Sequence, residues 1–171
     1  MAVCGLLRIG VDNPHRDRVL SRHRQADLWG RDVAIQASDP VFQKISQDPF
    51  ARWMGIELQE LRPGYSRLTM TVTPQMLNFH RIPHGGAVFS LADAAFAAAS
   101  NSHGQTALAL SMTISYLAAT AAGARLVAEA QELRKGHRAG FYQITVKTER
   151  GELIATCQAV VHRKKDSFVG Q

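Results

Sequence analysis

The spacing of apolar residues divides this chain into elements, beginning near position 39. Two Asp-Pro pairs, Asp39-Pro40 and Asp48-Pro49, each place a residue that favours the N-cap of a helix before a proline at the first helical position. The sequence therefore predicts two short helices. The first runs to about Gln47, and the second reaches Met54 before a glycine ends it.

Beyond this point apolar and polar residues alternate, which is the period of a half-buried strand. One predicted strand starts at Ile56, Pro63-Gly64 makes a turn, and a second strand follows from Tyr65. Four more strands are expected further along the chain, at residues 106–117, 125–134, 141–150 and 153–162. Short turns join them, so we expect an antiparallel sheet, followed by a frayed polar tail at residues 164–171.

The longest apolar run, residues 86–99, lies between the second and third strands and consists mostly of alanine. It is too long for an ordinary strand and too short for a membrane span, so it predicts a helix. A helix that is apolar on all sides is buried, which indicates an α+β fold with an antiparallel sheet curled around it. Its single ionisable residue is Asp93, and burying a carboxylate is costly unless it is satisfied or its pKa rises.

Composition places the chain among globular proteins. It has 171 residues, of which 46% are hydrophobic, and a formal net charge of +6. That size suits one domain, and that charge fits anionic partners without choosing between them. The two cysteines have no metal-type spacing and the first residues contain no long apolar segment, so we expect a cytoplasmic protein that lacks a secretory signal.

Residues 1–38 differ from the rest. They carry six arginines but also four aspartates, and their apolar residues show no clear period, so we expect a flexible Arg-rich extension. Such an arm raises the possibility of nucleic-acid binding, but the interspersed aspartates weigh against it. We place the folded domain at residues 39–163.

The predicted helix is preceded by His84-Gly85-Gly86, a sequence that suits an anion site. Glycines permit close approach to the backbone, and the first N–H groups of a helix attract negative charge, whether a phosphate or the oxyanion of an acyl transfer. A plain turn is the alternative for the two glycines alone. A carboxylate satisfied by backbone or serine groups is the alternative for Asp93.

The spacing of these two features has a geometric consequence. Gly85 and Asp93 are eight residues apart, which is roughly 12 Å along a helix. An oxyanion donor and a general base must both lie within about 3 Å of the reacting atoms. If the chain is an enzyme, two antiparallel copies of the helix are therefore needed, and the site is shared across a dimer.

The residues Asn78, His84-Gly85-Gly86 and Asp93, with the Ala-rich segment that follows, resemble the hotdog-fold acyl-CoA thioesterases of the phenylacetic acid degradation type. The likeness covers residues 39–163 and includes TISYLAAT and LRKGHRAGFYQITV, but Phe79 stands where close relatives often have glycine. It implies hydrolysis of an acyl-CoA, with phenylacetyl or hydroxyphenylacetyl as the first choice of acyl group.

The resemblance also implies roles for individual residues. Asp93 would be the general base or the nucleophile, the Gly85 N–H would polarise the thioester carbonyl, and Asn78 would position water or carbonyl. His84 would support the loop, and Gly86 belongs to the substrate-binding set. A turn residue at Asn78 and a satisfied loop histidine at His84 stay open as alternatives.

A basic segment comprising Arg134, Lys135, Gly136, His137 and Arg138 fits the phosphates of coenzyme A, or else forms a solvated hairpin tip. We expect no cofactor, because coenzyme A is part of the substrate. A metal held by His80 and His84 is disfavoured by the Pro-containing loop.

We expect a homodimer or homotetramer and neither membrane nor nucleic acid as a partner. The rival interpretation is a non-catalytic acyl-CoA-binding regulator with a basic N-terminal arm. The retained Asp93 argues against it, because a sensor has no need of that carboxylate.

Overall fold

The structure is a computed structural model that describes residues 33–170. The Arg-rich extension predicted for residues 1–38 therefore lies outside the described residues up to position 32. No helix of the described part is long and apolar enough to cross a membrane. The Cys157 thiol is buried and unpaired, and burial raises its pKa to about 11, whereas Cys4 lies outside the described residues.

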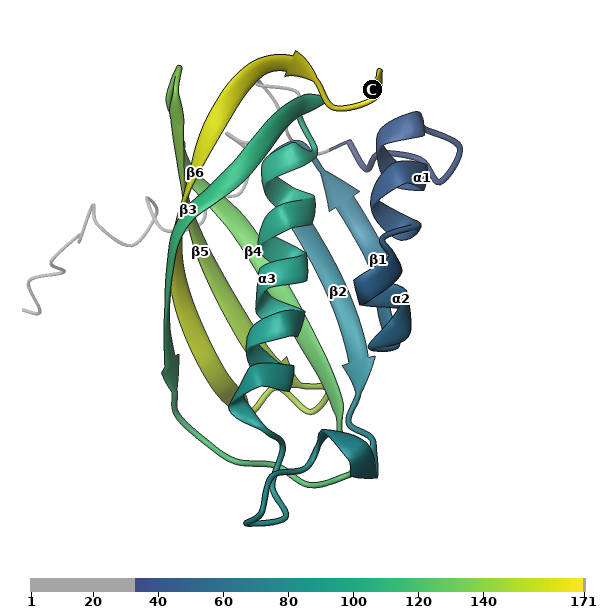
Figure 1. The fold of residues 1–171 in the computed structure, drawn as a ribbon, viewed down its shortest axis with the longest axis vertical. Coiled ribbons are helices and arrows are strands. Elements are labelled where there is room, and N and C mark those ends of the chain that lie inside the picture. Colours follow the sequence, from purple (N-terminus) through teal and green to yellow (C-terminus); the bar gives the residue numbers. More distant parts are fainter. Residues whose placement is uncertain (1–32, 171) are drawn as a thin grey trace, which may run out of the picture. The chain divides into compact units, whose positions relative to one another are not determined.

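The described chain forms six strands, three α-helices and one 3₁₀ turn. Figure 1 shows how these elements are arranged. The helices are α1 (Pro40–Ser46), α2 (Pro49–Trp53) and α3 (Gly85–Asn101), and the 3₁₀ turn η2 is Pro74–Met76. The strands are β1 (Ile56–Arg62), β2 (Tyr65–Thr71), β3 (Gln105–Tyr116), β4 (Arg125–Lys135), β5 (Ala139–Thr148) and β6 (Leu153–Ser167). They make one antiparallel sheet in the order β1-β2-β4-β5-β6-β3. The α+β hotdog arrangement predicted from the sequence is confirmed.

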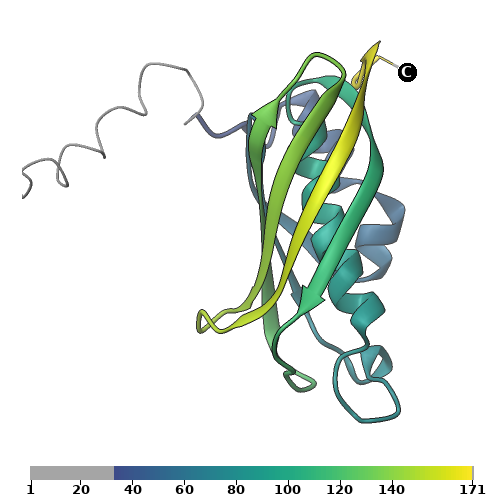
Figure 2. The same cartoon turned by 90° about the vertical axis from the view of Figure 1, so that its left-hand side faces the viewer.

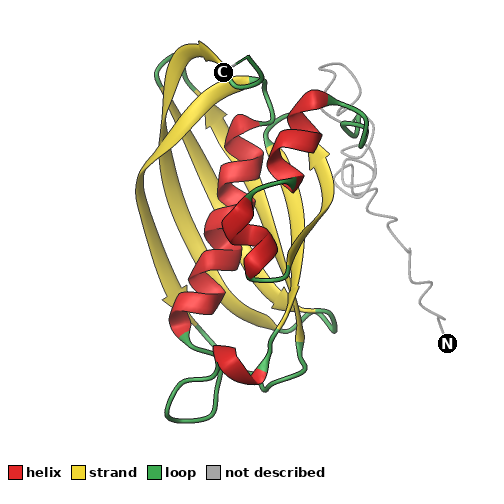
Figure 3. Ribbon diagram, turned by 45° about the vertical axis from the view of Figure 1, so that its right-hand side comes forward, coloured by secondary structure: helices red, strands yellow, loops and turns green. Residues whose placement is uncertain are grey.

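The sheet curves around α3, with α1 and α2 beside that helix on the same face (Figures 1 and 3). Figure 2 shows the twisted strands from the side, with the helices behind them. Small alanine side chains allow the sheet to approach α3 closely, and Phe96 packs edge-on against Tyr142 of β5 with ring centroids 5.3 Å apart. This packing buries the core beneath the helix.

The two predicted N-caps are present. The Asp39 carboxylate accepts a hydrogen bond from the Val41 N–H at 2.8 Å, and the Asp48 carboxylate accepts one from the Ala51 N–H at 2.7 Å. These bonds satisfy N–H groups that a helix start leaves unpaired, which is why both Asp-Pro pairs open helices.

The expectation of a helix buried on all sides is corrected. One stripe of α3 remains accessible in the single chain, and it comprises Phe89, Ser90, Asp93, Ala94 and Ala97. A helix stripe that one chain leaves accessible is available to a ligand or to another copy of the chain.

The predicted frayed tail is also corrected, because β6 continues to Ser167. The polar residues that suggested a tail pair with β3, so that Ser167 lies opposite Gln105, and Arg163 is buried. Pairing satisfies the backbone whatever the side chains are, and the side chains of the last four residues of β6 are all exposed to water. Likewise α3 extends two residues past the predicted end, because the Asn101 amide bonds both backbone groups of Ala107.

A truncation series tests where the folded domain begins. The Ile35 N–H donates to the Leu61 carbonyl at 2.7 Å, and Ile35 packs against the core. A chain beginning at residue 33 should melt within about 2 °C of the parent. A chain beginning at residue 38 loses that bond and contact, worth about 1–2 kcal/mol, and should melt roughly 2–8 °C lower. Calorimetry measures the melting temperatures of both truncated chains. Equal melting temperatures would mean that Ile35 does not stabilise the domain.

Candidate active site

The N-terminus of α3 is held by His84, which is its N-cap residue. The His84 Nδ1 accepts a hydrogen bond from the Gly86 N–H at 2.9 Å, and the His84 N–H donates to the Met76 carbonyl at 2.7 Å. An Nδ1 that accepts a bond carries no proton, so the neutral ring has its proton on Nε2. His84 and Gly86 both line a cavity of about 850 Å³ between α3, η2 and the end of α2.

Both glycines of the motif have a close side-chain neighbour. A Cβ at Gly86 would lie 3.0 Å from the His84 Nδ1, and a Cβ at Gly85 would lie 3.1 Å from the Tyr116 ring. The Tyr116 hydroxyl donates to the Gly85 carbonyl at 3.0 Å, whereas the Gly85 N–H has no acceptor among the described residues. An unpaired N–H at a helix start is an available donor for a negative oxygen.

Asn78 organises the loop that leads to this helix start. Its Oδ1 accepts hydrogen bonds from the His80 N–H at 2.9 Å and the Ile82 N–H at 3.4 Å, and Arg81 between them has a φ of 62°. Through this oxygen Asn78 stabilises the turn, which is one of the two interpretations from the sequence. Asn78 also lines a cavity of about 390 Å³ together with Gly85 and Tyr116.

Asp93 lies eight residues further along α3 and opens into a different cavity. This cavity, of about 490 Å³, is bounded by α1, α2 and α3. The carboxyl is half-buried, and it has no hydrogen bond or ion pair with any described residue. Its pKa is raised, first by burial and then by the nearby negative charge of Asp48.

One chain therefore does not bring the predicted catalytic residues together. The structure groups Asn78 with Gly85 and places His84 beside them, but Asp93 is roughly 12 Å further along the helix. Ser90 lines both the 850 Å³ cavity and the Asp93 cavity, so it marks the boundary between the two. The separation agrees with the expectation from residue spacing.

The basic segment covers the end of β4, with Arg134 and Lys135, and the turn that joins β4 to β5. Four of its residues, Lys135, Gly136, His137 and Arg138, line a cavity of about 780 Å³ together with Gln105 and the end of β6. Arg134 is not among the lining residues. Lys135 contacts His103, the second residue after α3, so this turn lies near the helix end opposite Gly85, about 24 Å along the axis.

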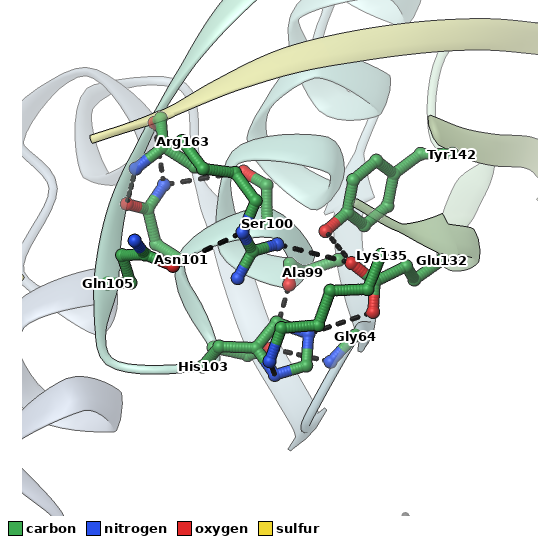
Figure 4. A network of polar contacts seen from close by, with 12 residues as sticks. Gly64, Ala99, Ser100, Asn101, His103, Gln105, Glu132, Lys135, Tyr142 and Arg163 are labelled. Atoms are coloured by element: carbon green, nitrogen blue, oxygen red, sulfur yellow. Dashed lines mark hydrogen bonds and ion pairs between the residues drawn. The ribbon is translucent and has the colours of Figure 1, made fainter. Parts of the chain in front are cut away.

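A buried charge network beside this turn was not predicted (Figure 4). The Glu132 carboxylate contacts the His103 Nε2 at 2.8 Å, and it accepts hydrogen bonds from the Tyr142 hydroxyl at 2.7 Å and the Arg163 Nη1 at 3.2 Å. Burial works to raise the Glu132 pKa, but the bonds from His103 and Tyr142 and the Arg163 charge outweigh it, so the pKa is lowered. Burial, followed by Glu132, raises the pKa of Tyr142.

The residues next to Glu132 in the sequence do not predict this network. Glu132 is a polar residue near the end of a strand, so the sequence pattern predicts an exposed side chain. Its partners come from positions 103, 142 and 163, and only the fold brings them together.

No three His, Cys, Asp or Glu side chains within residues 33–170 are grouped so that they could hold a metal ion. His80, considered as a ligand from sequence, instead stacks against Phe79 with ring centroids 4.2 Å apart.

The family model of the thioesterase superfamily matches residues 80–155, which include the helix start, α3 and most of the sheet. The acyl-coenzyme A thioesterase PaaI of Escherichia coli K12 is 40% identical over 124 residues, covering 72% of this chain and 89% of that protein. The chain belongs to the thioesterase superfamily.

Solved structures of the family agree with the fold. The PaaI protein from the E. coli phenylacetic acid degradation operon superposes with a TM-score of 0.72 at 37% identity, covering 77% of this chain and 99% of that one. A mutant of the phenylacetic acid degradation protein PaaI from Thermus thermophilus gives 0.66 at 38% identity, covering 68% and 100%. The resemblance to the phenylacetic acid degradation type is thereby confirmed.

The Glu132 network makes the free energy of unfolding depend on pH. A carboxyl with a lowered pKa stabilises the fold above its unfolded pKa, and that contribution is lost as pH falls through the folded pKa. Glu132→Gln should lower the unfolding free energy at pH 7 by about 2 kcal/mol or more, because Arg163 stays buried without its counter-charge. The deficit should shrink towards pH 3.

Urea titrations at several pH values measure this deficit. The matched control is Glu149→Gln, an exposed carboxylate near Arg125, which should change stability by less than about 0.5 kcal/mol. A deficit for Glu132→Gln that is the same at pH 3 and pH 7 would contradict the assignment.

Proposed function

We propose that this protein hydrolyses acyl-CoA thioesters to the free acid and coenzyme A, with aromatic acyl groups such as phenylacetyl or hydroxyphenylacetyl among its substrates. The observation that carries the proposal is the unpaired, half-buried Asp93 carboxylate, which opens into a largely apolar cavity. The aromatic preference is supported by the PaaI relatives, whose names place them in phenylacetic acid degradation.

Asp93 has two chemical routes. As a general base it takes a proton from water, whose oxygen attacks the thioester carbonyl. As a nucleophile it forms an acyl anhydride that water then hydrolyses. A raised pKa makes the carboxylate a better proton acceptor, which favours the first route without excluding the second. In either case the thiolate of coenzyme A leaves and the carbonyl oxygen gains negative charge.

That developing charge needs a donor, and the Gly85 N–H is available at a helix N-terminus. The bond from Tyr116 to the Gly85 carbonyl fixes the peptide that follows this N–H. The Asn78 Nδ2 has no acceptor among the described residues, so it remains available to water or the carbonyl while Oδ1 holds the loop. His84, through Nδ1, keeps the first turn of α3 in place and so supports the loop.

Completion of the site requires a second copy of the chain, so a homodimer, alone or within a homotetramer, is part of the proposal. Edge strand β3 is twelve residues long, and it exposes Leu108, Leu110 and Tyr116 with Leu117 just beyond. A long apolar edge invites pairing with another strand. Two-fold antiparallel pairing would place Gly85 of one protomer near Asp93 of the other.

The β4–β5 turn supports binding of the coenzyme A phosphates through Lys135, His137 and Arg138, with Gly136 giving the backbone room. Its distance of about 24 Å from Gly85 of the same chain suits a phosphate site that serves the other subunit. Arg134 stays a weaker candidate, because it does not line the cavity. No cofactor and a cytoplasmic location complete the proposal.

The rival function is acyl-CoA sensing without turnover. Thiol release from purified protein with phenylacetyl-CoA and acetyl-CoA separates the two, since a sensor binds both without releasing thiol.

Asp93→Asn should reduce kcat by roughly 10²- to 10⁴-fold, because a positioned base is lost. The same change should raise the melting temperature at pH 7. A carboxyl with a raised pKa costs stability above its folded pKa, and this cost disappears below the unfolded pKa, so the gain should fade towards pH 3. Glu152→Gln, an exposed carboxylate in the β5–β6 turn, is the matched control. Turnover by folded Asp93→Asn at the parent rate would refute the assignment.

Mixed dimers test the shared site. Asp93→Ala lacks the base, and Gly85→Pro lacks the N–H, so each homodimer should be inactive. Proline suits the first position of a helix, but its ring meets Tyr116, so Gly85→Ala, which adds a Cβ and keeps the N–H, is the control. Random pairing of equal amounts makes half of the dimers mixed, each with one intact site, and about a quarter of parent activity should return. Folded, exchanging mixtures that stay inactive would place both groups on one chain.

A further inference from the structure

The cavity beside Asp93 continues past the carboxylate along α3. Its helix wall is a stripe of small residues on one face, made of Ser90, Asp93, Ala94, Ala97, Ala98 and Asn101. The facing wall comes from the α1–α2 region, with Ile45, Pro49, Phe50 and Ala51. The part beyond Asp93 is therefore a mainly apolar channel, and its volume of about 490 Å³ includes this extension.

The channel is longer than an aromatic acyl group needs. Asp93 and Asn101 are eight residues apart, or about 12 Å along the helix. A carbon–carbon bond of about 1.5 Å advances an extended chain by roughly 1.25 Å per carbon, so this length holds about nine or ten carbons. A phenylacetyl group occupies roughly half of it.

Phe168 forms the far wall and is firmly held. Its N–H donates to the Gly104 carbonyl at 2.9 Å, and its carbonyl accepts from the Lys44 Nζ at 2.5 Å. The same ammonium lies 4.7 Å from the centroid of the Phe168 ring, a cation–π contact. Phe168 follows the end of β6 and lies beyond the segment that the family model matches.

We propose that this channel takes linear acyl chains of up to about nine carbons lengthwise along α3, and that Phe168 sets the upper limit. The inference rests on the proposed function, because Asp93 at the near end is the group that acts on the thioester carbonyl. The carboxylates of Asp48 and Asp93 and the ammonium of Lys44 line the same channel, so its lining carries charges of both signs.

The channel predicts a specific dependence on chain length. Each methylene buried in an apolar site raises kcat/KM by up to roughly fourfold. We expect kcat/KM for the parent protein to rise from acetyl-CoA to about nonanoyl- or decanoyl-CoA and then to fall, because longer chains meet the Phe168 ring.

Two variants move the limit in opposite directions. Phe168→Ala opens the far wall, so the optimum should move up by two or more carbons. Ala97→Leu places a side chain in the channel one turn, about 6 Å, beyond Asp93, so the optimum should fall to about six carbons or fewer. Ala97 is exposed, so leucine there does not load the core. Phe141→Ala, an exposed phenylalanine that does not line this cavity, is the matched control and should keep the parent profile.

The outcomes separate this inference from the proposed function. If the parent hydrolyses acyl-CoAs but both variants keep its chain-length profile, the channel assignment is wrong and the thioesterase proposal stands. If the parent releases no thiol from any acyl-CoA, the proposed function fails. The melting temperature of Asp93→Asn is then measured with acyl-CoAs of increasing chain length. If the channel binds the acyl chain, the rise in melting temperature should grow up to about nine carbons. The rise should be smaller when Ala97→Leu is added, and equal rises for all chain lengths would contradict the channel.

Discussion

The rest of the structure depends on the burial of α3 against the inner face of the sheet. Burial of a helix leaves its two ends as the places where backbone groups lack partners. At the N-terminus, His84 and Tyr116 bond to Gly86 and Gly85. At the C-terminus, Ser102 accepts from the Gly64 N–H while donating to the Ala99 carbonyl, and Asn101 binds Ala107. Both ends are therefore fixed to other elements by polar contacts, and one donor, the Gly85 N–H, is left without an acceptor in the described chain.

The alanines that permit this close packing also create the space next to it. On the face turned towards the sheet they let the backbone of α3 approach the strands, and on the opposite face they leave a channel between α3 and the α1–α2 region. A helix of leucines would fill both. The same sequence bias thus produces a tight core and a ligand-sized cavity, with Asp93 at the boundary between them.

Local patterns predicted most of the fold but only part of the site. The Asp-Pro pairs, the alternation of β1 and β2 and the alanine run each carry their signal within a few residues, so they were predictable. The Glu132 network was not, because Arg163 reaches Glu132 only through the pairing of β4 with β5 and of β5 with β6. His103 reaches it only because the end of α3 packs beside these strands. The frayed tail predicted at residues 164–171 was wrong for the same reason, since a polar end becomes a strand only when a partner strand exists.

The distribution of groups along α3 has a consequence for how activity arises. The donor at Gly85, the carboxylate of Asp93 and the basic turn near His103 are spread over about 24 Å of one helix, so folding of a single chain brings none of them together. An antiparallel second helix reverses this order and places the start of each helix beside the middle of the other. Under the proposed function, assembly rather than folding therefore completes the site. Asp93 and the Gly85 N–H are both unpaired within the described part of one chain. This is expected if each chain supplies only part of a site, because each group then acts on a thioester carbonyl that the other subunit helps to hold.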